Sequence, residues 1–166
     1  MHIRKTKVTD IAAAAAIYEA ARGFMRAAGN PYQWRDGYPG ENEILADMRE
    51  GRSYVCEQAG EVVAVFYFGE GPDPTYEKIY GGEWPSDEPY SVIHRIAVKH
   101  HGRGIVGFCF SECQRLAKVL RIDTHEDNIP MQRALARAGF VRCGTIYLKS
   151  GEPRIAFQKT REGDKL

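Results

Sequence analysis

The sequence has 166 residues, the size of one typical domain, and is long enough to bury a core without disulfides. Its 43% hydrophobic and 27% charged residues are ordinary for a globular protein, and a formal net charge of +1 argues against nucleic-acid binding, which usually needs a strongly basic surface. No apolar segment is long enough for a membrane span or a signal peptide, so we expect a cytoplasmic protein without a membrane partner.

The N-terminal part of the chain predicts one strand and two helices. Residues 2–8 are typical of a short strand, and the alanine-rich segment 11–28 predicts a helix because alanine is the best helix former. A Gly-Asn-Pro sequence ends this helix, and residues 41–50 predict a second one. The loop between them carries Trp34 and Tyr38, which either fold onto the core or form one wall of a substrate pocket. We take both as candidate substrate-binding residues.

The next segment predicts a hairpin and then a long connection. Residues 53–57 and 61–68 are two expected strands, and the second is apolar throughout, which is typical of a central strand covered on both faces. The connection 69–89 is acidic and aromatic and includes Tyr76 and Trp84. Such a loop suits a cationic, amine-bearing ligand, although an ordinary solvated loop is the alternative. Tyr76 and Trp84 are therefore further candidate substrate-binding residues.

An apolar strand over residues 92–98 runs into three glycines, Gly102, Gly104 and Gly107, and then into an expected helix over 104–120. A strand that turns through glycines into a helix gathers backbone N–H groups at the helix N-terminus, where they suit a phosphate or pyrophosphate. A plain tight connection is the alternative reading of the glycines.

The C-terminal part predicts a strand over 121–125, a helix that begins near Pro130 and ends at Gly139, and two strands over 141–148 and 154–159. The order of elements indicates an α/β fold with a mixed sheet in a single domain over 1–160, followed by a loose tail over 161–166. The four cysteines form no C-x-x-C pair, so we expect Cys109 and Cys113 to be reduced core residues and predict no metal site.

Two motifs lie in order along this chain. The first is the strand Ile96-Ala97-Val98 followed by His101-Gly102-Arg103-Gly104-Ile105-Val106, and the second is Asn128 followed by Gly139-Phe140. Together they resemble the pyrophosphate loop, Arg/Gln-x-x-Gly-x-Gly/Ala, and the second motif helix of the GNAT superfamily of acyl-coenzyme-A-dependent N-acyltransferases. The resemblance covers nearly the whole chain. It implies a mixed, mostly antiparallel central sheet with a splayed central strand and helices on both faces.

The chain departs from the family pattern at three positions. His101 stands where arginine or glutamine is usual, and Val106 replaces a small residue. A cradle of backbone N–H groups tolerates both if their side chains point away. Leu135 occupies the position where many members place a tyrosine that protonates the departing thiolate, so that role has no counterpart there.

The resemblance implies acetyl-CoA as the acyl donor. The backbone of Ile96 and Val98 would pair with its pantetheine arm, a backbone N–H near Ala97 or Val98 would polarise the thioester carbonyl, and Asn128 would contact the cofactor nearby. Amides from Arg103 to Gly107 would hold the pyrophosphate. The predicted cofactor-binding set is Ile96, Ala97, Val98, His101, Gly102, Arg103, Gly104, Ile105, Val106, Gly107 and Asn128.

The acceptor must be a neutral amine. Deprotonation at pH 7 costs roughly 4.6 kcal/mol for a lysine-like amine and about 1.4 kcal/mol for an α-amine, so a base is needed more for the first. His94 is the candidate base, because regular alternation along the strand would place it on the same face as Ile96 and Val98. The alternative is a structural histidine that is hydrogen-bonded inside the sheet. Tyr147 is a candidate proton donor to the thiolate or a packing residue. Asp123 and His125 are weaker candidates, which otherwise shape the turn before Asn128.

The sequence therefore predicts an N-acetyltransferase that transfers the acetyl group of acetyl-CoA to a primary amine of a small molecule or peptide by direct attack in a ternary complex. The alternatives are a catalytically weak or inactive CoA-binding module of the same fold, and an unrelated phosphate-binding α/β domain. A homodimer through the last strands is a further expectation.

Overall fold

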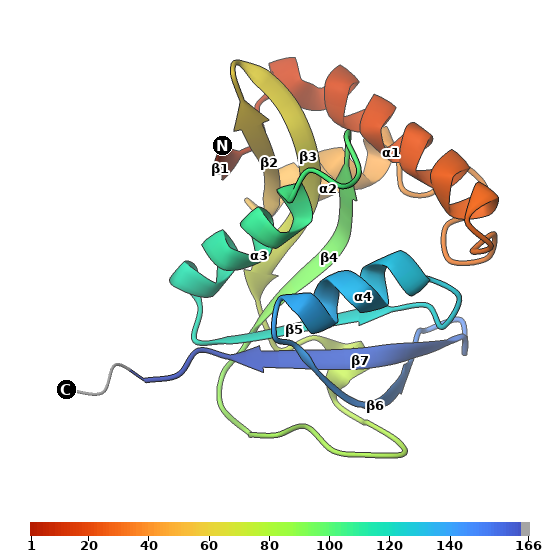
Figure 1. Cartoon of the computed structure of the whole chain (residues 1–166), viewed down its shortest axis with the longest axis vertical. Helices are drawn as coiled ribbons and strands as arrows, with labels where there is room; N and C mark the ends of the chain where they lie inside the picture. Colours follow the sequence, from red (N-terminus) through yellow and green to blue (C-terminus); the bar gives the residue numbers. More distant parts are fainter. Residues whose placement is uncertain (164–166) are drawn as a thin grey trace.

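The protein is described here by a computed structural model in which residues 1–163 are defined. A seven-stranded sheet has the strand order β1-β2-β3-β4-β5-β7-β6, and all neighbouring strands are antiparallel except β4 and β5 (Figure 1). This confirms the expected mixed, mostly antiparallel sheet. The strands are β1 (His2–Lys5), β2 (Ser53–Gln58), β3 (Glu61–Glu70), β4 (Ser91–Val98), β5 (Val119–Thr124), β6 (Val141–Tyr147) and β7 (Pro153–Thr160).

Within residues 1–163, four α-helices flank the sheet: α1 (Ile11–Ala27), α2 (Glu41–Arg49), α3 (Ile105–Leu116) and α4 (Ile129–Arg137). Their buried side chains belong to separate core clusters on the two faces. Ile17 and Tyr18 of α1 and Ile44 of α2 pack with Val65 and Ala97, whereas α3 and α4 pack with the alternate residues of the same strands. The expectation of helices on both faces is therefore confirmed.

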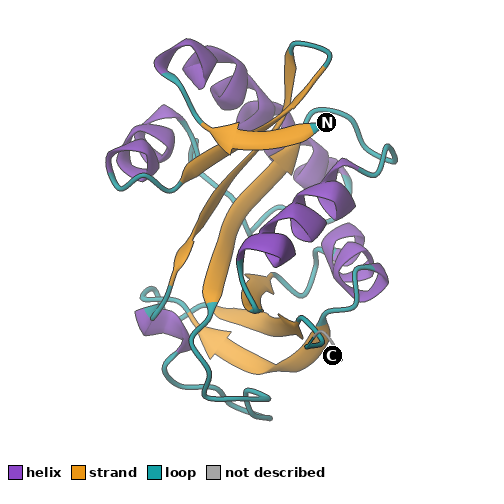
Figure 2. Ribbon diagram, turned by 90° about the vertical axis from the view of Figure 1, so that its left-hand side faces the viewer, coloured by secondary structure: helices purple, strands orange, loops and turns teal. Residues whose placement is uncertain are grey.

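The central strands β4 and β5 separate soon after they meet. They are parallel and paired only at Ser91 with Leu120 and at Val92 with Arg121. Beyond these pairs the edge of β4 that faces away from β3 has no strand partner in the described chain. Figure 2 shows the strands of the N-terminal half diverging from those of the C-terminal half. The splay opens the middle of the sheet to a ligand.

The predicted C-terminal ends of two elements are wrong. The first strand ends at Lys5, and the expected helix 104–120 ends at Leu116, since Val119 and Leu120 are buried in β5. The side-chain amide of Gln114 donates to the carbonyl oxygens of Ala117 and Lys118 (2.9 Å each). These carbonyl groups, which lie just after the helix, thereby gain a hydrogen-bond donor. Residues 164–166 of the predicted tail lie outside the described residues.

Two further predictions on packing are confirmed. Val63 to Phe66 of β3 are at most 2% exposed, between β2 and β4. Cys109 and Cys113 are free, fully buried members of the core. Within residues 1–163, no helix combines the length and apolar character needed to cross a membrane.

The long connection between β3 and β4 is fixed to the sheet by a buried arginine. The Arg121 guanidinium of β5 lies 4.0 Å from the ring centres of both Trp84 and Tyr90. It donates to Gln158 Oε1 (2.9 Å) and to the carbonyl oxygen of Ser86 (2.8 Å). Burial lowers the pKa of this guanidinium, and the nearby Tyr90 opposes that shift. The loop is thus an ordered wall.

We expect Arg121→Ala to lower the free energy of unfolding by about 2–4 kcal/mol, because it removes two cation–π contacts and leaves the buried Gln158 and the half-buried Ser86 without their donor. Urea denaturation followed by circular dichroism measures the change. Arg142→Ala, at an exposed position of β6, is the control and should change stability by less than about 0.5 kcal/mol. Equal stability of the two variants would contradict this account of the loop.

Candidate functional site

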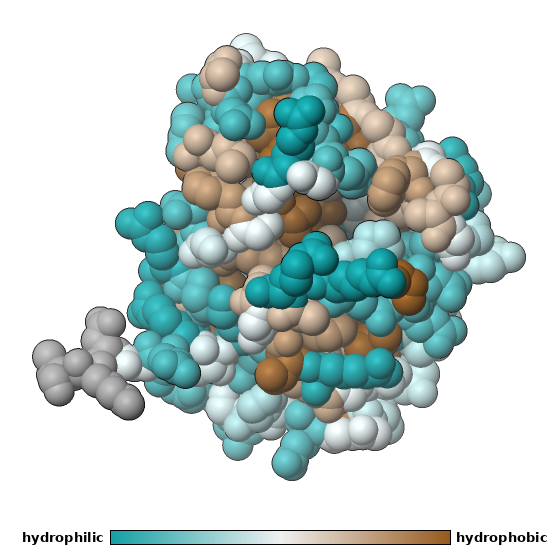
Figure 3. Space-filling view, viewed as in Figure 1, coloured by the Kyte–Doolittle hydropathy of each residue, from teal (hydrophilic) through white to brown (hydrophobic). Residues whose placement is uncertain are grey.

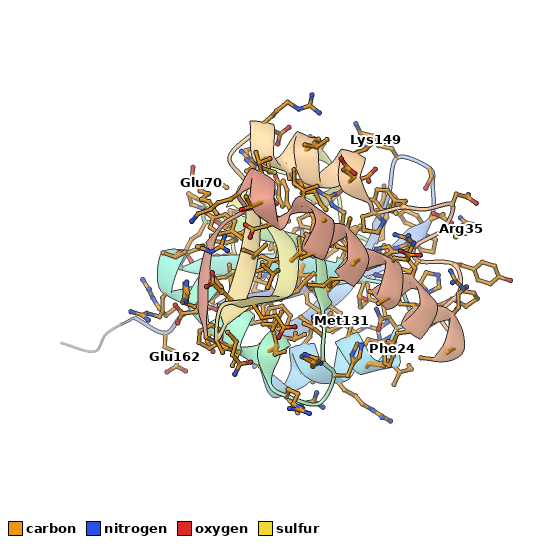
Figure 4. All side chains as sticks on the ribbon, turned by 90° about the horizontal axis from the view of Figure 1, so that it is seen from above. Phe24, Arg35, Glu70, Met131, Lys149 and Glu162 are labelled. Carbon is orange, nitrogen blue, oxygen red and sulfur yellow. The ribbon has the colours of Figure 1, made fainter. Side chains whose placement is uncertain are left out.

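A cavity of about 570 Å³ opens between the C-terminal end of α1, the N-terminal end of α3, and α4. Figure 3 shows apolar surface inside this hollow with hydrophilic side chains at its rim. Phe24 and Met131, labelled in Figure 4, both line it, from α1 and α4 respectively. All the residues predicted to bind acetyl-CoA line this cavity.

The glycine loop forms a cradle of backbone groups at one end of this cavity. Gly102 and Gly104 have φ of 71° and 72°, a left-handed conformation that favours glycine, and Gly104 is the N-cap of α3. The first N–H groups of an α-helix have no partner within the helix. A Cβ atom built at Gly102, Gly104 or Gly107 would have no neighbouring atom within 4 Å, so a ligand can approach these backbone groups closely.

The open edge of β4 forms a second wall of the same cavity. The N–H of Lys99 donates to the carbonyl oxygen of Val63 on β3 (2.8 Å). Because backbone groups alternate in direction along a strand, the N–H and C=O groups of Val98 and Ile96 point to the other side, where β5 has separated. This edge can add a strand-like partner such as an extended amide chain.

His101 lies flat against Phe24 of α1, with ring centres 3.8 Å apart and planes 13° from parallel. Burial lowers the pKa of its imidazole, which favours the neutral form. The side chain therefore stacks on α1 without adding positive charge at neutral pH. Arg103, Arg137 and Lys159 also line the cavity and supply cations for an anionic ligand.

A second cavity, of about 500 Å³, continues from the first. Both are lined by Met25, Ile96, Asn128 and Met131, so these residues mark the junction. Asn128 is fixed there: its Oδ1 accepts from the N–H of Met131 (3.1 Å) and caps α4, and its Nδ2 donates to Gln33 Oε1 (2.9 Å).

His94 and Asp73 form a hydrogen-bonded pair in the second cavity, with 2.7 Å between His94 Nε2 and Asp73 Oδ2. Thr75 donates to the other carboxylate oxygen through its N–H (2.9 Å) and hydroxyl (2.7 Å). Burial raises the pKa of Asp73, but the hydrogen bonds from His94 and Thr75 outweigh it and lower the value to about 2. An ionised carboxylate only accepts, so Nε2 carries the proton and Nδ1 of the neutral ring has the free lone pair.

A second carboxylate, Asp123, lies beside the same imidazole. Its Oδ2 is 3.9 Å from His94 Nδ1 and accepts a hydrogen bond from the hydroxyl of the buried Tyr76 (2.7 Å). Burial and the nearby Asp123 raise the pKa of Tyr76 well above its ordinary value, so this hydroxyl keeps its proton. A proton taken up at Nδ1 would thus place the imidazolium between two carboxylates, a stabilising arrangement.

The predicted strand parity of His94 is wrong because β4 contains a bulge. Arg95 has φ of 51°, and the register with β3 shifts so that His94 pairs with Tyr67 and Ala97 pairs with Val65. His94 therefore shares a face with Ala97, whereas Ile96 points into the opposite core cluster. The bulge turns His94 toward Asp73 and Asp123.

The aromatic loop after α1 both packs on the core and lines the second cavity. Trp34 is 7% exposed and meets Tyr18 edge to face, and it also lines the cavity with Tyr38. The hydroxyl of Tyr38 accepts from Arg95 Nη1 (3.3 Å), and Arg95 Nη2 donates to both oxygens of Asp47 (2.8 Å each). The two readings of Trp34 are therefore compatible.

Three predicted site residues lie away from the described lining of both cavities. Tyr76 is buried behind Asp123, and Trp84 stacks on Arg121 and donates to the carbonyl oxygen of Tyr76 (2.9 Å). Tyr147 is exposed on β6, where it packs edge to face on Tyr80. The expected proton-donor role of Tyr147 is not supported by this position, since Tyr147 lines neither cavity in the described chain.

Other expected roles are also resolved by position. His125 lines neither cavity in the described chain; its Nδ1 accepts from the N–H of Asp127 (3.0 Å), which shapes the turn before Asn128. Leu135 is fully buried, so nothing polar replaces the usual tyrosine at that position. No motif in the sequence singles out Asp73, Gln33 or Arg154, and only the acidic character of the 69–89 loop points to Asp73.

Known structures share the fold of this chain. A GNAT-family acetyltransferase from Streptococcus agalactiae is 31% identical, with a TM-score of 0.89 over 98% of this chain and 96% of its own. A putative acetyltransferase from Salmonella typhimurium, solved with acetyl-CoA, is 20% identical, with a TM-score of 0.59 over 99% and 96%. A ribosomal-protein-alanine N-acetyltransferase from Brucella melitensis is 21% identical, with a TM-score of 0.60 over 97% and 100%.

No protein-family model matches the sequence, and no curated protein does. The two structures below 25% identity show the fold alone. The fold of this chain is that of the S. agalactiae acetyltransferase over nearly the whole length of both chains. With the similarity to the S. agalactiae protein, this chain belongs to the GNAT family of acetyltransferases.

Proposed function

We propose that the chain transfers the acetyl group of acetyl-CoA to a primary amine by direct attack in a ternary complex. The observation that carries this proposal is the junction of two cavities at Ile96, Asn128 and Met131. One cavity has the N–H cradle and the open strand edge; the other holds the pair of His94 and Asp73.

In this proposal acetyl-CoA supplies a thioester carbonyl at the junction. The N–H groups of α3 hold the pyrophosphate, and the free backbone groups of Ile96 and Val98 align the donor along β4. Because Gly102, Gly104 and Gly107 have no Cβ, the pyrophosphate can approach their backbone closely. The acetyl-CoA held by the S. typhimurium protein of the same fold supports this choice of donor.

His94 acts as the general base on the acceptor. Its Nδ1 takes a proton from the attacking amine as the C–N bond forms and the C–S bond breaks, and Asp73 holds the ring in the required tautomer. The imidazolium formed then lies beside Asp123 as well. The same proton is available for the departing thiolate, which would account for a site that has Leu135 in place of a tyrosine.

A thermal-shift measurement tests the donor. We expect acetyl-CoA and CoA at 100 times their Kd to stabilise the fold by about 2.7 kcal/mol, and ATP to have a much smaller effect. Absence of stabilisation by either CoA species would contradict the proposal. Thiol release with an amine panel then tests turnover: CoA binding with no release for any amine would favour the inactive CoA-binding module.

A further inference from the structure

The second cavity carries positive as well as negative groups. Asp73 and Asp123 lie beside His94, while Lys149 and Arg154 line the wall formed by the β6–β7 hairpin. In the register of β5 and β7, Asp123 pairs with Ala156, and Arg154 is two residues further along on the same face. The anionic and cationic groups therefore stand on neighbouring positions of one wall.

Arg154 is a buried cation with little compensation from the protein. Its side chain is 5% exposed, and the nearest carboxylate oxygen, Glu152 Oε2, is 3.9 Å from Nη2. Its hydrogen bond within the described residues runs from Nη1 to the carbonyl oxygen of Pro153 (2.9 Å). Glu152 is instead engaged by Arg35 at 2.5 Å.

Such an arrangement is unusual because a buried charge is normally paired at hydrogen-bond distance. The contrast is Arg95 in the same cavity, which is bonded to both oxygens of Asp47 at 2.8 Å. A guanidinium has five N–H donors in a fork that matches a carboxylate. The unfilled donors of Arg154 thus fit an anionic group brought by the acceptor.

We propose that the acceptor is a free α-amino acid, whose carboxylate is bound by Arg154 with Lys149 at the rim, and whose amine lies at His94 and Asp73. The inference rests on the proposed acetyltransferase function and names its substrate class. In an α-amino acid one carbon separates the amine from the carboxylate, which suits charged groups on neighbouring positions of one wall. Trp34, Leu148 and Met131 line the remaining space and favour an apolar side chain.

The energetics of the amine agree with this class. An α-amine is deprotonated at pH 7 at a cost of only about 1.4 kcal/mol, against about 4.6 kcal/mol for a lysine-like amine. A single histidine base is sufficient to deprotonate an α-amine, and no longer proton relay is needed. A peptide N-terminus has the same kind of amine but lacks the adjacent carboxylate, so Arg154 separates these two acceptor types.

Matched acceptors test the inference on the unaltered enzyme. Methionine, leucine and phenylalanine are each compared with their α-amides and with the corresponding amines that lack the carboxyl group, and CoA release is measured with acetyl-CoA. We expect kcat/KM for at least one amino acid to exceed that of its amide and amine by 30-fold or more. Turnover of amides or amines as fast as the acids would overturn the inference and leave the proposed function standing. No turnover in any arm would overturn the inference, and thiol release with the wider amine panel would then decide whether the proposed function stands.

The variant Arg154→Gln tests the residue. We expect KM for the amino acid to rise 10- to 100-fold, KM for its amide to be unchanged, and the Kd of acetyl-CoA to stay within twofold. Arg154→Lys should recover part of the preference, because it restores the charge without the fork. Arg115→Gln, at an exposed position of α3, is the control with no expected effect. An unchanged preference for the acid in folded Arg154→Gln would remove Arg154 from the site.

Discussion

His94→Ala is expected to lower kcat by about 10²- to 10⁴-fold while the Kd of acetyl-CoA changes by less than about threefold. The split follows from the geometry: His94 lines the second cavity, and the backbone cradle that would hold the donor belongs to the first. Steady-state kinetics with a turned-over amine and titration calorimetry with acetyl-CoA measure the two quantities. His2→Ala, at a histidine with a side chain 62% exposed, is the matched control.

A fall in acetyl-CoA affinity as large as the fall in kcat would mean that His94 supports the cavity rather than the proton transfer. Unchanged turnover would exclude His94 as the base. Asp73→Asn adds a second test, because an amide does not enforce the tautomer as a carboxylate does. As Asp73 is a positioning residue in this mechanism, its variant should lower kcat less than His94→Ala and shift the pH profile of kcat/KM.

Those features of the fold that depend on local pattern could be predicted from the sequence. The apolar run of β3, the glycine turn into α3 and the Asn128 cap of α4 each involve residues within a few positions of one another. Each pattern is local, so its secondary structure can be predicted without knowledge of distant contacts. The end of α3 was mispredicted because Val119 and Leu120 continue an apolar pattern that suits a helix as well as a strand.

The second cavity was harder to predict because its contacts join distant segments. Asp73 meets His94 across 21 positions, and Gln33 meets Asn128 across 95. The bulge at Arg95 places the His94 side chain on the opposite face of the sheet from the one that regular alternation predicts. A positive φ at an arginine cannot be recognised from the alternation of apolar and polar residues. The acidic and aromatic character of the 69–89 loop suits either a cationic ligand or an ordinary loop, and the sequence cannot show that Tyr76 and Trp84 support the wall behind the cavity.

Gly107→Leu is expected to weaken acetyl-CoA binding by 100-fold or more without unfolding the protein. Gly107 lies in the first turn of α3 with no positive φ, so a larger residue meets no backbone strain there and gains helix propensity. A Cβ at this position enters open space, and the position lines the first cavity, so a leucine side chain would occupy the place proposed for the pyrophosphate. Gly104→Leu is a poorer test, because its φ of 72° would add strain to the loss of space.

Titration calorimetry measures the affinity of Gly107→Leu, and a thermal melt shows that the fold is retained. Glu112→Leu, in the same helix but outside the described lining of both cavities, controls for the added apolar side chain. Gly107→Ala should give an intermediate loss, since a single methyl group takes up less of the cavity than leucine. Normal acetyl-CoA affinity in a folded Gly107→Leu variant would place the pyrophosphate elsewhere. That result would mean that the glycine loop does not bind the cofactor. The open edge of β4 would still offer hydrogen-bonding groups for the pantetheine arm.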